Sequence, residues 1–136
     1  ASRILSWRLG SLWTYASPLR GGMDAAAPGH IDPFDLVNIY NFDLVDNDTM
    51  IYTLMGQNSI AKSLSPYLHN SAFRKMGKNA LLIPTPVDNC EDGLKMLEIL
   101  GGTGAAITVP FKQDILPYLS FHSTDVQLIG ACNTLV

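Results

Sequence analysis

The sequence predicts an α/β fold, a three-layer α/β/α arrangement whose sheet is mainly parallel. From Thr49 onward, short apolar runs alternate with longer segments that carry helix start and stop signals. The apolar runs are nearly continuous, as in strands that are buried on both faces of a sheet. Because parallel strands need a crossover connection between them, this alternation predicts helices covering both faces of one sheet.

The expected elements follow in order from the start of this region. The first strand covers 49–56 and stops at Gly56, and the next helix, 65–77, has Ser65 as its N-cap and Gly77 as its stop. The remaining expected elements are strand 79–86, helix 89–102, strand 104–110, a short helix 112–119 broken near Pro117, and strand 129–136. In strand 104–110, Pro110 prevents continuation beyond Val109.

Residues 1–47 have a different pattern from residues 48–136, so we place a domain boundary between them. The first part holds a strand-like stretch at 10–17, a glycine-rich loop at 18–30, and a helix that Asp32 caps and Pro33 opens. These pieces resemble the end of a larger fold and offer few partners to one another. The chain also begins without Met, so we expect it to be cut from a longer one.

Composition narrows the possible classes of protein. Apolar residues make up 47% and charged residues 15%, which is typical of a globular domain with a real core. The net charge of -3 argues against a nucleic-acid or anionic-membrane partner, and no apolar run has the length of a membrane span. Cys90 and Cys132 are isolated, which favours buried free thiols, and the three histidines lack metal-ligand spacing, so no metal is expected.

Ser63 and Ser65 stand at the start of the expected helix 65–77. Backbone N–H groups at a helix N-terminus attract carboxylates and phosphates, and two hydroxyls there can form a neutral clamp for an anion. A plain N-cap with a spectator serine is the alternative interpretation.

Two further positions could carry chemistry at the ends of expected strands. Lys112 follows strand 104–110, at the carboxyl edge where open parallel sheets bind ligands, and Thr108 should face the same crevice. A lysine there can exchange protons with a substrate hydroxyl, although a surface lysine at a helix start is the alternative. Asn133 could bind a polyol, or it could simply occupy a turn.

The order and spacing of three motifs carry a family resemblance. The stretches GQNSIAKSLSPYLHNSAF, GAAITVPFKQD and IGACNT are similar to the substrate-binding, N-terminal domain of shikimate dehydrogenase. The resemblance implies that Ser63 and Ser65 hold the substrate carboxylate and that Thr108 and Asn133 surround the ring hydroxyls. It implies that Lys112 is the catalytic lysine in the NADP-dependent reduction of 3-dehydroshikimate to shikimate.

The N-terminal part carries a second resemblance. SRILSWRLGS and AAPGHIDPFDLVNIYNF resemble the C-terminal end of a type I 3-dehydroquinate dehydratase, as fused to shikimate dehydrogenase in plant-type bifunctional enzymes. This resemblance implies that Arg3 binds the carboxylate of the dehydratase substrate. Ala26 and His30 replace a Ser and a Gln of the dehydratase loop, and Ala106 replaces an Asn of the dehydrogenase motif.

These resemblances set the functional expectations. NADP would be bound by a domain absent from this chain, because no G-x-G-x-x-G follows a strand here, and the fragment should not turn over alone. The expected partner is shikimate or 3-dehydroshikimate, with a homodimer or an exchanged N-terminal segment possible, in the cytoplasm or in a plastid if the source is a plant. One alternative is a quinate dehydrogenase. The other is a quinate- or shikimate-sensing regulatory protein, and the substitutions at Ala26, His30 and Ala106 favour this second alternative.

Overall fold

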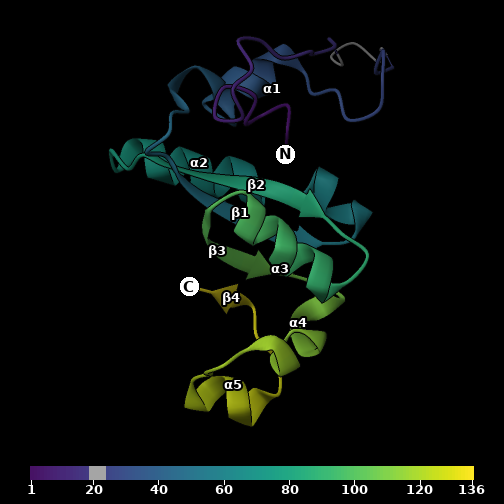
Figure 1. Cartoon of the computed structure of the whole chain (residues 1–136), viewed down its shortest axis with the longest axis vertical. Helices are drawn as coiled ribbons and strands as arrows, with labels where there is room; N and C mark the ends of the chain where they lie inside the picture. The colour runs from purple at the N-terminus through teal and green to yellow at the C-terminus, as the bar shows by residue number, and fades with distance from the viewer. Residues whose placement is uncertain (19–23) are drawn as a thin grey trace. The chain divides into compact units, whose positions relative to one another are not determined.

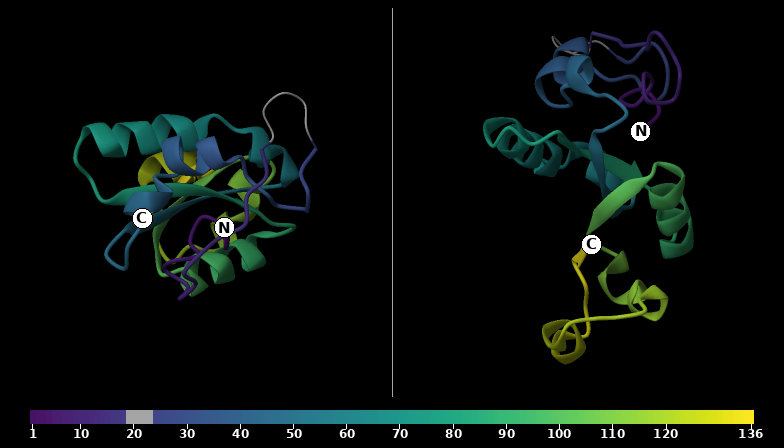
Figure 2. Two further views of the ribbon diagram at one scale, coloured as in Figure 1. Left: turned by 90° about the horizontal axis from the view of Figure 1, so that it is seen from above. Right: turned by 60° about the vertical axis from the view of Figure 1, so that its left-hand side comes forward.

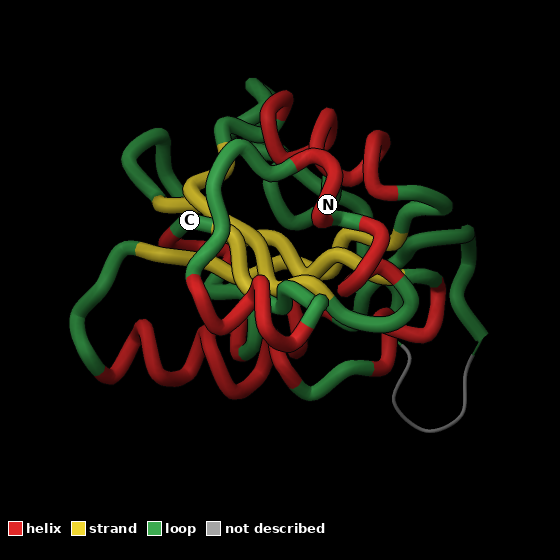
Figure 3. Tube along the Cα trace, turned by 90° about the horizontal axis from the view of Figure 1, so that it is seen from below, coloured by secondary structure: helices red, strands yellow, loops and turns green. Residues whose placement is uncertain are grey.

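The four strands in the described part of the chain form one sheet with the order β2-β1-β3-β4. This computed structural model describes residues 1–18 and 24–136 (Figure 1). The strands are β1 (Met50–Gly56), β2 (Ala80–Pro86), β3 (Gly102–Ile107) and β4 (Thr134–Leu135), drawn in yellow in Figure 3. β1 and β3 are parallel, whereas β4 pairs antiparallel with β3. The predicted fold class, a mixed α/β domain with a mainly parallel sheet, is therefore confirmed.

The chain divides into two compact units. One contains residues 1–50 and 64–83, and the other contains residues 51–63 and 84–136. We predicted a domain boundary between residues 1–47 and 48–136 from a change in the sequence pattern. The division into compact units does not test that boundary.

The second unit is built around the parallel pair β1 and β3. Helix α3 (Cys90–Ile99) packs on β3, as Figures 1 and 2 show, and the short helices α4 (Phe111–Asp114) and α5 (Thr124–Ile129) follow. Its buried core joins strand and helix side chains: Met55, Cys90, Ala105, Ile107, Phe111, Ile115 and Cys132. A Cβ atom on Gly93 would lie 2.5 Å from the Met55 side chain, so the missing side chain lets α3 approach β1 closely.

The first unit contains helices α1 (Pro33–Asn38) and α2 (Ser65–Lys75) together with the N-terminal segment. Asp32 caps α1 as predicted, because its carboxylate accepts a 2.8 Å hydrogen bond from the Phe34 amide. The Arg8 guanidinium donates to the carbonyls of Asn47 and Thr49, at 3.1 and 2.8 Å, and so fastens the N-terminal segment to the start of β1. Ile4 and Leu5 are buried.

Four expectations about local structure are wrong. Residues 10–17 form no strand, and Leu12 and Trp13 remain largely exposed. Leu64, not Ser65, is the N-cap of α2 and makes no side-chain capping bond, so Ser65 is the first helical residue. β3 ends at Ile107 rather than Val109, because the chain turns at Thr108.

The fourth error concerns the region before the last strand. Residues 124–129 form α5, which Ser123 caps by accepting a hydrogen bond from the Val126 amide and which Gly130 ends with a φ of 70°. An N-cap serine and a glycine at the C-terminal end are ordinary signals of helix boundaries. Our prediction of a strand over 129–136 did not use them. β4 is consequently only two residues long and runs antiparallel.

Across residues 1–18 and 24–136, no helix combines the length and the apolar character needed to cross a membrane. In the same residues, no three His, Cys, Asp or Glu side chains gather in a way that could hold a metal ion.

Candidate functional site

The backbone segments that carry Thr108, Lys112 and Asn133 meet where β3 ends. The Thr108 amide donates a 3.0 Å hydrogen bond to the carbonyl of Met55 on β1, and the adjacent Ile107 amide donates at 2.8 Å to the carbonyl of Asn133. The Cys132 amide, in turn, donates at 2.7 Å to the carbonyl of Lys112. Three backbone bonds therefore join the segments that carry these residues, and all three lie in the second unit.

A tight turn and a buried aromatic side chain position Lys112. The Phe111 amide donates a 3.0 Å hydrogen bond to the Thr108 carbonyl, which closes the turn between β3 and α4. Phe111 and Ile115 are buried in the core, 3% and 0% exposed, whereas Lys112 between them is half-buried. α4 is thus anchored on its apolar side, and the Lys112 ammonium is carried at the edge of the unit.

Ser63 lies on the loop that follows β1, on the same unit as Thr108. Its amide donates a 2.9 Å hydrogen bond to the Ile60 carbonyl at the end of the 3-10 helix Asn58–Lys62. A Cβ atom on Gly56 would lie 2.5 Å from Ile60 Cγ2 and 2.7 Å from Thr108 Cγ2. Only glycine at the end of β1 lets this loop and the Thr108 turn pack so closely.

The structure places Ser65 and Arg3 in the other compact unit. Ser65 opens α2 and is half-buried. The Arg3 guanidinium lies 5.9 Å from the centroid of the Tyr15 ring, at a hollow of about 520 Å³ that the N-terminal segment forms by itself. Their predicted contacts with substrate carboxylates remain predictions.

Ala26 and His30 both have hydrogen-bond partners within the chain. His30 Nδ1 and the buried Ser17 Oγ form a hydrogen bond, and the same Oγ accepts a 3.2 Å bond from the Ala26 amide. The Ser17 amide also donates to the Ile31 carbonyl at 3.2 Å. Ser17 therefore joins the N-terminal segment to residues 26–31. Residues 19–23 lie outside the described residues.

The second unit also has a hollow of about 590 Å³, lined in part by Phe121, Val126, Cys132 and Leu135. None of the predicted site residues lines it. Asn133, which follows Cys132 in sequence and is exposed, belongs instead to the cluster at the end of β3.

Sequence reasoning missed the residues that support the cluster. Gly56 was interpreted only as the end of a strand, and Ile60 and Cys132 received no role at the site. The available signal was the glycine itself, because a glycine that ends a strand often marks a close approach of another segment.

The three segments of this cluster carry a hydroxyl, an ammonium and an amide near the carboxyl end of β3. These groups can donate hydrogen bonds to the oxygens of a small polyol, and the ammonium can also transfer a proton to an oxygen it contacts. Open α/β sheets commonly bind ligands at the carboxyl ends of their parallel strands, which is where these three segments lie.

Comparison with known proteins shows the family to which this chain belongs. A family model described as the shikimate dehydrogenase substrate binding domain matches residues 54–135, and the chain belongs to this family.

Two curated relatives show how far the likeness extends. A shikimate dehydrogenase (NADP(+)) of Pyrococcus furiosus is 37% identical over 97 residues, which cover 68% of this chain and 34% of the relative. The bifunctional chloroplastic 3-dehydroquinate dehydratase/shikimate dehydrogenase of Arabidopsis thaliana is 30% identical over 138 residues, which cover 99% of this chain and 22% of the relative. The chain thus spans a third or less of the length of these two relatives.

Solved structures agree with the sequence comparison. The shikimate dehydrogenase of Aquifex aeolicus superposes with a TM-score of 0.62 at 29% identity, covering 66% of this chain and 34% of that one. A Listeria monocytogenes shikimate 5-dehydrogenase in complex with shikimate and NAD gives 0.59 at 29%, with 66% and 32% covered. A quinate dehydrogenase of Corynebacterium glutamicum in complex with NAD gives 0.58 at 26%, with 63% and 33% covered.

Proposed function

We propose that the whole protein is a shikimate dehydrogenase, which reduces 3-dehydroshikimate to shikimate with NADP, and that residues 48–136 bind its substrate. The observation that carries this proposal is the cluster of Thr108, Lys112 and Asn133 at the carboxyl edge of β3. The family match over residues 54–135 supports it.

In this proposal Lys112 is the catalytic residue. Its ammonium gives a proton to the carbonyl oxygen of 3-dehydroshikimate as that oxygen becomes a hydroxyl, and it accepts the proton in the reverse direction. The half-buried position of Lys112 beside the buried Phe111 keeps its ammonium at the sheet edge, where the ring would lie.

The other predicted site residues orient the substrate. Thr108 and Asn133 would bind ring hydroxyls, and Ser63 and Ser65 would hold the carboxylate through two hydroxyl groups. Gly56 would keep Thr108 and the Ser63 loop close together, as its contacts with Ile60 and Thr108 indicate.

NADP would supply the hydride when it is bound, and we place its site in a part of the protein outside these 136 residues. No strand in the sequence is followed by the glycine pattern that receives a dinucleotide. The 136-residue chain should therefore bind shikimate without oxidising it.

We further propose that residues 1–47 derive from the C-terminal end of a 3-dehydroquinate dehydratase. The support is the Arabidopsis thaliana relative, a bifunctional dehydratase and dehydrogenase whose likeness covers 99% of this chain. Arg3 would then be the remnant of a carboxylate-binding site. The protein would work in the cytoplasm, or in the plastid if its source is a plant.

Calorimetric titration of the 136-residue chain with shikimate tests the binding site. Lys112→Ala should weaken binding by about tenfold or more, because a hydrogen bond from a charged group is lost. Lys95→Ala is the matched control, since Lys95 is an exposed lysine paired with Glu91 and should bind as the wild type does. Equal affinities for Lys112→Ala and wild type would exclude Lys112 from the site.

A second titration with quinate separates the two dehydrogenases. The quinate dehydrogenase among the similar structures makes this comparison necessary. Tighter binding of shikimate supports the proposal, and tighter binding of quinate would replace it. NADP-dependent oxidation of shikimate by the 136-residue chain alone would contradict our assignment of the cofactor site.

A further inference from the structure

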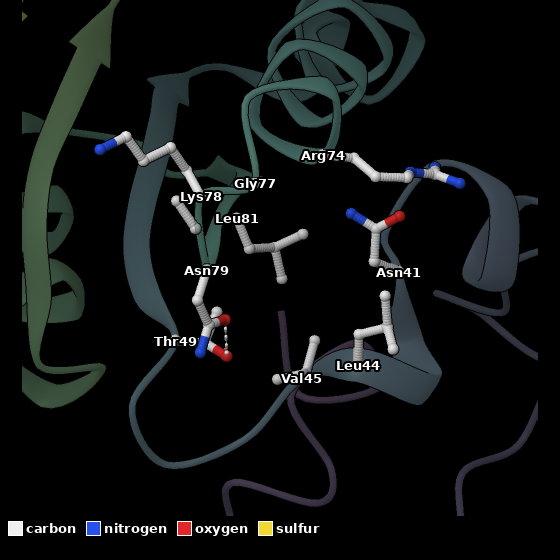
Figure 4. Close-up of a pocket in the computed structure, with 10 residues that line it drawn as sticks. Asn41, Leu44, Val45, Thr49, Arg74, Gly77, Lys78, Asn79 and Leu81 are labelled. Atoms are coloured by element: carbon white, nitrogen blue, oxygen red, sulfur yellow. Dashed lines mark hydrogen bonds between the residues drawn. The ribbon is translucent and has the colours of Figure 1, made fainter.

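The hollow drawn in Figure 4 lies apart from the proposed substrate site. It has a volume of about 270 Å³ and belongs to the first unit, between residues 41–49 and the end of α2 with the start of β2. Its lining includes the buried Val45 and Leu81, and Figure 4 shows the charged ends of Arg74 and Lys78 directed away from it. None of the proposed shikimate-binding residues lines this hollow, so it supplies no contact to that site.

The backbone on both sides of Asn133, in the second unit, is held by hydrogen bonds. The Ile107 amide of β3 donates to the Asn133 carbonyl at 2.8 Å. The Cys132 amide donates to the Lys112 carbonyl at 2.7 Å. The buried Cys132 thiol also donates to the Thr134 carbonyl at 3.2 Å, which closes a small ring around Asn133. Because these bonds fix the backbone, the freedom that remains at Asn133 is in its side chain.

The Thr134 hydroxyl restrains that side chain. Thr134 Oγ1 donates a 3.0 Å hydrogen bond to Asn133 Oδ1. Thr134 is the first residue of β4 and lies opposite Ala106 of β3, so its hydroxyl comes from a paired strand position. Within residues 1–18 and 24–136, Asn133 Nδ2 makes no hydrogen bond. With its oxygen engaged by Thr134, the exposed amide offers chiefly its N–H groups.

Two of the three side chains proposed around the substrate ring are then hydrogen-bond donors toward it. The Lys112 ammonium has N–H donors and no lone pair, and the Asn133 amide directs its N–H groups outward. The Thr108 hydroxyl is the group of the cluster that can also accept a hydrogen bond. A substrate oxygen bound by Lys112 and Asn133 must therefore use its lone pairs, as a ring hydroxyl or a carbonyl oxygen can.

Binding of a ring would strengthen the contact between Thr134 and Asn133. Both residues are exposed in the ligand-free chain, so water competes for their hydrogen bond. A ring bound over Asn133 would exclude that water and lower the local dielectric constant, which makes the bond stronger. A side chain that is already oriented also loses less conformational entropy when the ligand binds.

We propose that Thr134 is a positioning residue of the substrate site: its hydroxyl holds the Asn133 amide so that Nδ2 donates to a substrate oxygen. This proposal rests on the proposed function, because shikimate is the ligand that Asn133 would bind. Thr134 acts through Asn133 and does not itself contact the ring.

The positioning role can be measured without a ligand. In the isotope-labelled 136-residue chain, the heteronuclear NOE of the Asn133 side-chain NH2 group reports how strongly that amide is restrained. Thr134→Val has nearly the same shape but no hydroxyl and should lower this NOE, whereas Thr134→Ser keeps the hydroxyl and should preserve it. Thr103→Val, at an exposed position of β3, is the matched control and should leave the NOE unchanged.

Calorimetric titration with shikimate measures the effect on binding. Thr134→Val should weaken binding about threefold, whereas Thr134→Ser and Thr103→Val should bind as the wild type does. Asn133→Asp keeps the shape of the side chain but has no N–H donor, so it should weaken binding about tenfold or more. In an Asn133→Ala background, Thr134→Val should cause no further loss, because the residue through which Thr134 acts is gone.

The backbone amide NMR spectrum of each variant reports whether it is folded. An unchanged NOE in Thr134→Val, an unchanged affinity in Thr134→Val, or wild-type affinity in Asn133→Asp would each overturn the proposal. Additive losses from Thr134→Val and Asn133→Ala would also overturn it, because Thr134 would then contact the ring directly. If the wild-type chain fails to bind shikimate while Thr134→Val still lowers the NOE, the proposed function is rejected and the restraint of Asn133 by Thr134 stands.

Discussion

Asn70 on α2 and Leu82 on β2 form two hydrogen bonds with each other. The Asn70 Nδ2 donates to the Leu82 carbonyl at 3.0 Å, and the Leu82 amide donates to Asn70 Oδ1 at 2.7 Å. Asn70 is fully buried, and β2 stands at the end of the sheet order, with one side that none of the described strands covers. The asparagine amide therefore satisfies strand groups that would otherwise be buried and unpaired.

Replacement of this amide should destabilise the fold. Asn70→Ala leaves the Leu82 N–H and C=O without partners and opens a small cavity, so we expect a loss of about 2–4 kcal/mol in the free energy of unfolding. Urea denaturation followed by circular dichroism measures it. Asn58→Ala, at an exposed position, is the control. A loss for Asn70→Ala that does not exceed that of the control would mean that the two bonds contribute no net stability.

Gly56→Ala should disturb both stability and substrate binding. The new methyl group would lie 2.7 Å from Thr108 Cγ2 and 2.5 Å from Ile60 Cγ2, so the Thr108 turn must shift. Such overpacking costs about 1–3 kcal/mol, and the shift should weaken shikimate binding measured by calorimetry.

A double variant separates contact with Thr108 from other effects. Thr108→Ser removes Cγ2 but keeps the hydroxyl, so Gly56→Ala with Thr108→Ser should recover part of the stability lost in Gly56→Ala. Strict additivity of the two changes in the free energy of unfolding would contradict a direct clash.

Tyr40 should make stability depend on pH in the alkaline range. Burial, and then the negative charge of Asp35, raise the pKa of Tyr40 to about 12. Below pH ~10 the phenol is neutral in both the folded and unfolded states, so its full contribution is present. Above pH ~10 the unfolded state loses the proton first, and stability falls until the folded pKa is passed.

The effect can be measured as the free energy of unfolding at several alkaline pH values. Tyr40→Phe should remove about 1 kcal/mol of the decline between pH ~10 and ~11. Tyr67→Phe, on the exposed face of α2, should decline as the wild type does. A Tyr40→Phe curve that runs parallel to the wild-type curve would show that this phenol is not the cause.

The cysteines should be unreactive in the folded protein. Both are free and buried, and burial, followed by the charge of Asp114, raises the pKa of the Cys90 thiol. Because only the thiolate attacks, Ellman's reagent at pH ~8 should label Cys90 far more slowly in the native Cys132→Ser variant than in the same variant in urea. Equal rates would show that the native core opens readily around α3.

The sequence predicted those elements whose signals are local. Pro33 and Asp32 mark α1, and Gly77 follows α2 with a φ of 63°, both as expected. Within the expected helix 89–102, α3 forms at Cys90–Ile99 after Asn89, which caps it by accepting from the Asp92 amide. The free cysteines were also predicted correctly. The stretch 10–17 was misjudged because strand formation needs a partner strand, and β-rich composition alone cannot supply one.

For the site, the chain order of the motifs identified the family and the candidate residues Ser63, Thr108, Lys112 and Asn133. It could not reveal that the Lys112 carbonyl meets the Cys132 amide, 20 positions apart in sequence (132 − 112), because that bond depends on how β4 returns to β3.

By itself the sequence determined the α/β alternation, most helix boundaries and the family, because apolar periodicity, caps and motifs are properties of neighbouring residues. Only the tertiary structure decided where β3 stops, why Gly56 must lack a side chain, and which buried amides find partners. Those outcomes depend on close packing and hydrogen-bond satisfaction between segments that are distant in the chain.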